Sequence, residues 1–209
     1  MNFDDQLGSV KNYFENTLSK HGTTAKGVDW NSEQAREFRF DQLARIITQK
    51  EEFSILDYGS GYGAFAGYMD SKGLKYSQYI GYDIVPAMVE QGRKLFEKDA
   101  RLSFTTQLSD VPLVDYATAC GVFNMKLDAS YGDWNHFVLS CLKEMDDHCR
   151  LGFSVNFLTK YSDADKMRPD LYYADPCFLF DYAKTYFSKN VAILHDYGLY
   201  DFTLLVRKE

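Results

Sequence analysis

The chain has 209 residues, and its 23 Lys and Arg against 30 Asp and Glu give a formal net charge of −7 with histidine neutral. This acidic balance argues against a nucleic-acid surface built from basic residues. Hydrophobic residues make up 45% of the chain and charged residues 25%, which is typical of one soluble globular domain and argues against disorder.

The opening residues Met-Asn-Phe-Asp-Asp-Gln have neither the basic nor the apolar region of a signal peptide, and no stretch approaches about 18 uninterrupted apolar residues. We therefore expect a cytoplasmic protein that does not bind a membrane. The 4 cysteines include no CxxC pair. This favours reduced, mostly structural thiols over a disulfide framework or a zinc site.

Two helices are expected before the first strand. Apolar residues at three- and four-residue steps across 3–20 form the stripe of an amphipathic helix, and a break follows at 21–24. A second helix is expected to begin near Asn31, which has capping-box spacing to Gln34, and to run through Ile47. We assign the N-terminal helices to 1–50 and the main domain to 51–209, the two forming one globular unit.

Beyond these helices, short apolar strands alternate with helical segments. The strands are expected at 53–57, 79–83, 102–106, 116–122 and 151–158, with helices at 64–72, 86–98 and 133–148 between them. Such alternation predicts an α/β fold, with a mostly parallel sheet that carries helices on both faces.

The end of the chain breaks this alternation. After a helix that opens at Asp175-Pro176, two strand-like runs at 191–195 and 200–207 are separated by only Asp196-Tyr197-Gly198-Leu199. Parallel neighbours need a crossover of a dozen or more residues, so this last pair is expected to form an antiparallel hairpin.

The strongest chemical motif is a glycine-rich segment directly after the first strand. Gly59, Gly61 and Gly63 follow Asp57, and a helix is expected to begin just beyond them. Glycines allow turns that are closed to other residues and let a ligand approach the backbone, while a helix N-terminus offers free N–H groups. The spacing alone also fits the G-x-G-x-x-A form of a dinucleotide site, because Ala64 completes it.

An acidic residue ends the next strand. Asp83 follows Gly59 by 24 residues, and a carboxylate at this place can accept hydrogen bonds from both hydroxyls of an adenosine ribose. Together the two motifs predict an adenosine-containing cofactor at the carboxyl ends of the first two strands. A purely structural alternative is a glycine turn with Asp83 as a helix cap.

These residues carry a family resemblance. Asp57-x-Gly59-x-Gly61-x-Gly63 after an apolar strand, Asp83 ending the second strand and the closing hairpin resemble the class I S-adenosylmethionine-dependent methyltransferases. The resemblance extends from about residue 30 to the end. It implies a Rossmann-like, seven-stranded sheet ordered 3-2-1-4-5-7-6 with strand 7 antiparallel, and S-adenosyl-L-methionine as the cofactor. Asp57 and the hairpin favour it over an ordinary NAD site.

The resemblance also implies roles for matching positions around the cofactor. Gly59, Ser60, Gly61 and Gly63 would lie under its methionine part, with Asp57 ordering the loop. Further contacts would come from Asp83 to the ribose, from Ile84, Gln107 and Leu108 to the adenine, and from Cys120 and Gly121 beneath the methyl group. The acid common in the family after the third strand is missing here until Asp110.

Helices before the sheet fold over the cofactor in relatives. By this resemblance Trp30 would cover the cofactor, and Arg39 would pair with its methionine carboxylate through a planar fork. Core packing of Trp30 and a solvated helix face for Arg39 are the alternative roles.

Loops at the carboxyl ends of the later strands should face the methyl group. They supply the expected substrate-binding residues, which are Asn124, Asn156, Tyr172, Tyr173 and Tyr197. His195 ends a strand beside Asp196, which could orient its ring, and the pair is our candidate for catalytic base chemistry. In the alternative, His195 packs in the hairpin and Asp196 begins its turn. No metal site is expected.

The function expected from this sequence is methyl transfer by in-line displacement to an O or N atom of a small polar metabolite, either amino-bearing or sugar-like. Cys120-Gly121-Val122-Phe123-Asn124 is not an Asn/Asp-Pro-Pro-Tyr motif, which argues against nucleic-acid and glutamine substrates. A nicotinamide-dependent oxidoreductase and a non-catalytic S-adenosylmethionine-binding protein are the alternatives. The oligomeric state is left open.

Overall fold

The computed structural model describes residues 3–28, 32–49 and 52–208. Within them an eight-stranded sheet has the order β3-β2-β1-β4-β5-β8-β7, with β6 paired to β5 off this path. The strands are β1 (Phe53–Tyr58), β2 (Tyr76–Tyr82), β3 (Leu102–Thr105), β4 (Val114–Ala119), β5 (Cys149–Thr159), β6 (Tyr173–Ala174), β7 (Asn190–Leu194) and β8 (Asp201–Arg207).

The sheet is parallel except for β8, which runs antiparallel to both of its neighbours, β5 and β7. The predicted order and the predicted hairpin are therefore confirmed, with β7 and β8 as the sixth and seventh strands of the prediction. The additional strand, β6, has only two residues and pairs with the end of β5. Two residues are too few to produce an alternating pattern, so the sequence did not indicate it.

Six α-helices and four short 3-10 turns accompany the strands among the described residues. They are α1 (Phe3–His21), η1 (Ala25–Val28), α2 (Glu33–Leu43), η2 (Ala44–Ile46), α3 (Ala64–Ser71), α4 (Pro86–Leu95), η3 (Leu108–Asp110), α5 (Tyr131–His148), η4 (Ala164–Lys166) and α6 (Pro176–Tyr186). Of these, α1, η1, α2 and η2 precede the first strand. Asn31, the predicted cap of α2, lies outside the described residues. Ser32 caps this helix, because its Oγ accepts a hydrogen bond from the Ala35 N–H at 3.1 Å. None of the described helices is both long and apolar enough to cross a membrane.

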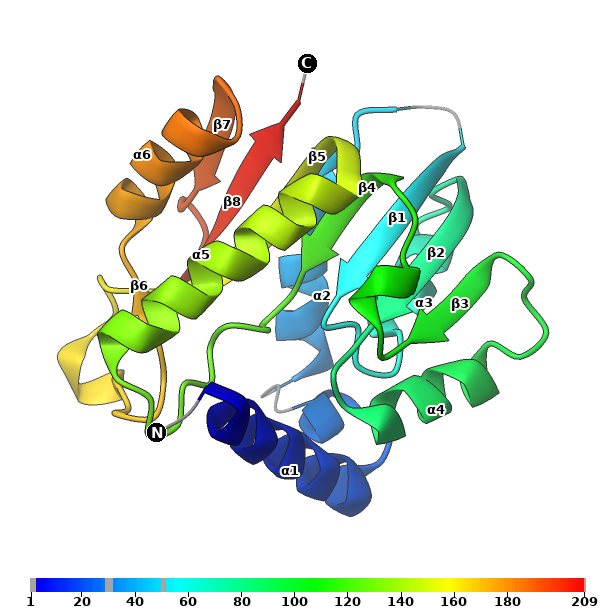
Figure 1. Ribbon diagram of the computed structural model, residues 1–209, viewed down its shortest axis with the longest axis horizontal. Helices are drawn as coiled ribbons and strands as arrows, with labels where there is room; N and C mark the ends of the chain where they lie inside the picture. The colour runs from blue at the N-terminus through cyan, green and yellow to red at the C-terminus, as the bar shows by residue number, and fades with distance from the viewer. Residues whose placement is uncertain (1–2, 29–31, 50–51, 209) are drawn as a thin grey trace.

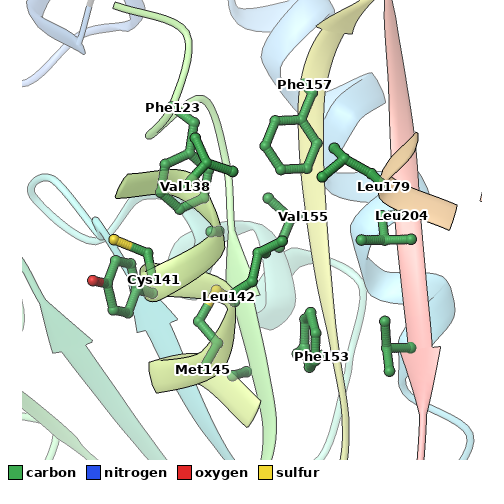
Figure 2. Close-up of a cluster of buried hydrophobic side chains, with 14 of the residues drawn as sticks. Phe123, Val138, Cys141, Leu142, Met145, Phe153, Val155, Phe157, Leu179 and Leu204 are labelled. Atoms are coloured by element: carbon green, nitrogen blue, oxygen red, sulfur yellow. The ribbon is translucent and has the colours of Figure 1, made fainter. Parts of the chain in front are cut away.

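Helices cover the sheet on both faces, with α5 and α6 in front and α2 and α3 behind (Figure 1). The larger apolar cluster lies under α5 and α6, where Phe123, Val138, Leu142, Phe153 and Phe157 pack together (Figure 2). The second cluster joins α2, α3 and α4 to the opposite face of the sheet. Strand β8 contributes to both clusters because its side chains alternate between the two faces of the sheet. Leu204 belongs to the first cluster and Leu205 to the second.

Two features of the fold shape the region around the carboxyl ends of the strands. Helix α1 lies just beyond these ends (Figure 1) and packs against η1 and α4. The connection from β3 to β4 holds only the single turn η3, and Leu108 and Val111 from it pack on the α5 side of the sheet. No α-helix therefore covers β1 and β2 on that side within the described chain.

Candidate cofactor site

The loop after β1 is built from glycines in the left-handed region. Gly59, Gly61 and Gly63 have φ values of +75°, +54° and +87°, which side chains with a Cβ rarely adopt. The N–H groups of Gly59 and Ser60 both donate to the carbonyl oxygen of Tyr82, at 2.7 and 2.9 Å. A Cβ on Gly59 would lie 2.3 Å from Val122 Cγ2. The loop thus holds the ends of β1, β2 and β4 together and cannot accept a larger residue at its first glycine.

Asp83 lies next to this loop at the end of β2. Its side chain is 8% exposed; Oδ2 accepts a hydrogen bond from the Gly61 N–H and Oδ1 accepts one from the Val85 N–H, both at 2.8 Å. Burial raises the pKa of Asp83 to about 6, against the lowering effect of the two N–H donors. Each carboxylate oxygen has a second lone pair, so the group can also accept hydrogen bonds from a ligand.

Asp57 is buried at the end of β1 and also lines the cavity described below. Its Oδ2 accepts a hydrogen bond from the Tyr79 hydroxyl at 2.5 Å. Burial raises the pKa of Asp57 to about 7; the Tyr79 hydrogen bond lowers it, and the charge of Asp83 raises it further. The Tyr79 hydrogen bond joins β1 to β2, and a role of Asp57 in ordering the glycine loop stays a prediction.

A cavity of about 270 Å³ opens above the glycine loop. Its walls come from the loops after β1, β2 and β4, including Gly59, Asp83 and Gly121, and from α1 and α2 on the opposite side. Helix α1 contributes the apolar side chains of Leu7, Val10 and Phe14. The site is therefore an apolar enclosure with a few polar groups that converge from the strand ends, as small-molecule sites usually are.

Arg36 of α2 is the basic residue that lines this cavity in the described chain. Its Nη1 donates to the Tyr62 hydroxyl at 2.7 Å, whereas its Nε is buried without a hydrogen-bond partner among the described residues. A buried N–H group of a guanidinium is costly to leave unpaired. The arrangement suits a ligand carboxylate, which would satisfy the open donor.

Eight of the predicted cofactor residues line the cavity, and four described ones do not. The lining residues are Asp57, Gly59, Ser60, Gly61, Asp83, Ile84, Cys120 and Gly121. Gly63 instead lies against the rings of Phe96 and Phe104, Gln107 is exposed, and Leu108 packs in the core. Trp30 lies outside the described residues.

The fourth of these, Arg39, lies in a buried network outside the cavity lining. Its Nε pairs with Asp201 Oδ2, and Asn156 Nδ2 donates to the same oxygen at 3.3 Å. Asn156 Oδ1 in turn accepts from the Gly121 N–H at 2.7 Å. Burial raises the pKa of Asp201, and the Arg39 charge opposes this. The network ties α2 and β8 to the turn after β4, so it supports a wall of the cavity.

The residues predicted to bind substrate lie away from the cavity lining. Tyr172 is buried and its hydroxyl donates to Asn135 Oδ1 at 2.6 Å, while its N–H donates to the carbonyl oxygen of Asn124 at 2.8 Å. The Tyr173 hydroxyl accepts from the Arg168 N–H at 2.9 Å. These contacts hold the segment after β5 onto the loop after β4. A substrate role for them stays a prediction.

The hairpin residues are also remote from the lining. Tyr197 shares a hydrogen bond of 2.9 Å with the Thr203 hydroxyl. His195 and Asp196 are exposed, and the His195 ring lies beside those of Tyr161 and Phe202, at 6.0 and 5.7 Å between centroids. The structure gives the pair no contact with the cavity, and its catalytic role stays a prediction.

Sequence reasoning did not single out several residues that line the cavity. These are Arg36 and Tyr62 near the glycine loop, and Tyr58, Tyr82, Phe137 and Glu144 toward α5. Tyr58 and Tyr82 are each one residue from an acid assigned to the site, but adjacent strand residues point to opposite faces, so the strand pattern alone does not indicate them. Nothing in the pattern of α5 separates Glu144 from its solvated neighbours.

Comparisons with known proteins agree with this geometry. A family model described as a methyltransferase domain matches residues 56–129. A Mycobacterium tuberculosis (strain ATCC 25618 / H37Rv) protein named "Putative methyltransferase Rv1506c" is 47% identical over 164 residues, which cover 78% of this chain and 98% of that protein. The chain belongs to the class I S-adenosylmethionine-dependent methyltransferases.

Solved methyltransferases share the fold at low sequence identity. The N-methyltransferase NodS of Bradyrhizobium japonicum WM9, solved with S-adenosyl-L-homocysteine, has a TM-score of 0.65 and 14% identity over 95% of this chain and 97% of its own. The magnesium protoporphyrin IX methyltransferase of Synechocystis PCC 6803, also solved with S-adenosylhomocysteine, has a TM-score of 0.54 and 10% identity. The match covers 100% of this chain and 88% of that protein. Membership of this family confirms the expected cofactor, S-adenosyl-L-methionine.

Proposed function

We propose that this methyltransferase transfers the methyl group of S-adenosylmethionine to an O or N atom of a small polar metabolite, and that the cavity above the glycine loop is its cofactor site. The observation that carries the proposal is the junction of Asp83 with the loop: a buried carboxylate fixed by the Gly61 and Val85 N–H groups at the wall of the cavity. Such a carboxylate is preorganised to accept the two ribose hydroxyls of an adenosine.

Other residues of the cavity complete the fit. Gly59 and Gly61 present only backbone to the cavity, and Ile84 offers an apolar face to the adenine. Arg36, with its unpaired Nε, would bind the methionine carboxylate, the role that the sequence resemblance gave to Arg39. The Cys120-Gly121-Val122 wall would lie beside the methyl group.

When bound, S-adenosylmethionine supplies a methyl group on a sulfonium that is already an activated electrophile. The residues of this chain then have to hold an acceptor atom in line and exclude water, and such placement accounts for up to about 7–11 kcal/mol of a barrier. Leu7, Val10 and Phe14 from α1 provide the apolar cover. In this proposal residues 1–50 cover the cofactor site and 51–209 form the methyltransferase domain.

The partner in this proposal is a small molecule, with no nucleic acid and no membrane, and the location is the cytoplasm. The acidic balance of the chain supports this choice, because a net charge of −7 repels a phosphate backbone.

The test is transfer of a radiolabelled methyl group from S-adenosylmethionine to metabolites extracted from the native host. We expect a labelled small product with the wild-type chain and a strong loss of label with Asp83→Ala. Binding of S-adenosylhomocysteine without any labelled product would instead favour a non-catalytic binding protein. A rise in melting temperature with NAD or NADP, and none with S-adenosylhomocysteine, would favour an oxidoreductase.

A further inference from the structure

The cavity continues from the glycine loop along the α5 side of the sheet. We call this part the α5 branch; it is lined by Tyr58 and Tyr82 from the strands and by Phe137, Cys141 and Glu144 from α5. The branch exists because the β3–β4 connection is a single 3-10 turn, so no α-helix of the described chain fills the space beside α5 over β1 and β2. The motifs assigned to the cofactor include none of these five residues.

Aromatic rings dominate the surface of the α5 branch. The rings of Tyr58 and Tyr82 meet edge to face, with 5.0 Å between centroids. Phe137 of α5, whose ring packs against those of Phe123 and Trp134, lines the same cavity. Tyr82 and Phe137 are only half-buried, so ring surface is open to a ligand. The face of an aromatic ring carries negative charge density, which attracts cations.

Glu144 places a carboxylate in this aromatic branch. The Tyr58 hydroxyl donates to Glu144 Oε2 at 2.7 Å. Burial and then the charge of Glu144 raise the pKa of the Tyr82 hydroxyl to about 12. Glu144 is half-buried, so solvent screens its charge only in part.

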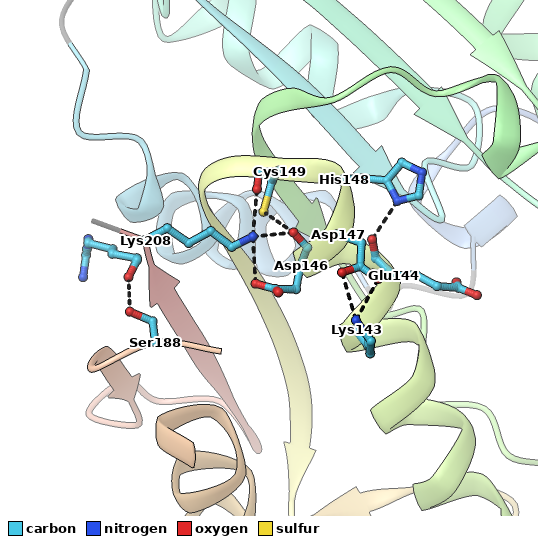
Figure 3. A network of polar contacts seen from close by, with 9 residues as sticks. Lys143, Glu144, Asp146, Asp147, His148, Cys149, Ser188 and Lys208 are labelled. Carbon is cyan, nitrogen blue, oxygen red and sulfur yellow. Dashed lines mark hydrogen bonds and ion pairs between the residues drawn. The ribbon is translucent and has the colours of Figure 1, made fainter. Parts of the chain in front are cut away.

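No described lysine, arginine or histidine forms an ion pair with the Glu144 carboxylate. Its neighbour Lys143 pairs with Asp147 at 2.9 Å, and the His148 ring bonds the main-chain oxygen of Glu144 rather than its carboxylate (Figure 3). A half-buried carboxylate among aromatic rings, without a protein cation, has the composition of a site for an organic cation.

We infer that the α5 branch binds an organic ammonium group, and that the methyl acceptor carries this group. The inference rests on the proposed function, because the branch and the cofactor site share one cavity. Glu144 supplies the opposite charge, and Tyr82 and Phe137 supply ring faces for the N-methyl or methylene groups around the nitrogen. A neutral or anionic metabolite would leave the charge of Glu144 without a partner.

The test uses choline as the probe and 3,3-dimethyl-1-butanol, which has the same shape without the charge, as its control. Both are titrated by NMR into the full chain saturated with S-adenosylhomocysteine. We expect saturable choline binding and an affinity at least tenfold lower for the neutral alcohol. Glu144→Gln should lower choline affinity at least tenfold and leave S-adenosylhomocysteine affinity unchanged. Tyr82→Leu, which keeps apolar bulk but removes the ring, should weaken choline severalfold.

Asp147→Asn is the matched control variant, since it removes one negative charge from an exposed position on the same helix; it should bind choline as the wild type does. Three outcomes would each overturn the inference: equal binding of choline and the alcohol, unchanged choline affinity in Glu144→Gln, or no saturable choline binding. Failure of S-adenosylhomocysteine itself to bind the wild-type chain would instead refute the proposed function, so the two failures are distinguishable.

Discussion

Replacement of Gly59 by alanine tests whether the glycine loop is shaped as the structure indicates. Gly59 has φ +75°, and a Cβ at this position would meet Val122 Cγ2 at 2.3 Å and Cγ1 at 3.2 Å. The left-handed backbone costs a residue with a Cβ about 1–2 kcal/mol. Overpacking against Val122 adds about 1–3 kcal/mol. We expect Gly59→Ala to lower the free energy of unfolding by about 2–5 kcal/mol in all.

Two further variants separate these contributions. Gly73 has φ +67°, and a Cβ added there would meet no atom within 4 Å, so Gly73→Ala should cost only the backbone share, about 1–2 kcal/mol. Val122→Ala removes both Cγ atoms that the new methyl group would strike. The double variant Gly59→Ala/Val122→Ala should therefore be about 1–3 kcal/mol more stable than the sum of the two single losses of unfolding free energy predicts.

The assay is urea unfolding of the wild type, the three single variants and the double variant, followed by calorimetric titration of each with S-adenosylhomocysteine. Gly59→Ala should also weaken S-adenosylhomocysteine binding, because Val122 and Gly59 line the same cavity. Additivity of Gly59→Ala and Val122→Ala within about 0.5 kcal/mol would refute the close approach of the β1 and β4 loops.

Three other predictions concern single side chains. Burial raises the pKa of Asp57 from its ordinary 3.8 to about 7, so the folded chain keeps a proton that the unfolded chain releases, and the free energy of unfolding falls between about pH 4 and pH 7. The free energy of unfolding of Asp57→Asn minus that of the wild type should therefore be more positive at pH 7.5 than at pH 4.5, as measured by urea unfolding. A difference that is equal at the two pH values would contradict this. Arg36→Met should weaken S-adenosylhomocysteine binding about 10- to 100-fold in calorimetry with little change in stability. Arg39→Met leaves buried Asp201 without its ion-pair partner and should lower the free energy of unfolding by about 3–5 kcal/mol. The reverse pattern would exchange the roles of the two arginines. If His195 is a base, His195→Ala lowers turnover and spares cofactor affinity, and full turnover would remove it from the mechanism.

Most strands and the closing hairpin could be predicted because their signals are local, whereas the strand order came from the family resemblance. The four residues between the last two predicted strands exclude a parallel connection, so they predict that β7 and β8 run antiparallel to each other. That β8 is the strand reversed against the rest of the sheet was implied by the family resemblance. The positions of Asp57 and Asp83 at strand ends likewise follow from their neighbours in sequence. By contrast, β6 forms only through its pairing with the end of β5, a contact between separate segments that two residues cannot signal.

The wall that α2 contributes to the cavity illustrates what the sequence could not decide. Arg36 and Arg39 are three residues apart on one helix and point in neighbouring directions. Asp201, 162 residues further along the chain, pairs with Arg39 and leaves Arg36 at the cavity. The choice between the two arginines thus depends on where β8 packs against α2.

The tyrosines show the same limit. We expected Tyr172, Tyr173 and Tyr197 to bind substrate, yet Tyr172 is 1% exposed and bonds to Asn135. Tyr58 and Tyr82, which do line the cavity, follow the strand pattern and carry no motif. They face the cavity because the β3–β4 connection is short, a feature visible in the sequence only once the sheet order is known.

The central claim is that the cavity beside Asp83 binds S-adenosylmethionine. Its most direct test is calorimetric titration of S-adenosylhomocysteine into the wild-type chain and into Asp83→Asn, with NAD as the competing ligand. We predict one bound S-adenosylhomocysteine per chain, no heat of binding from NAD, and an affinity at least tenfold lower in Asp83→Asn. Affinity that is unchanged by the substitution, or binding of NAD in place of S-adenosylhomocysteine, would contradict the account.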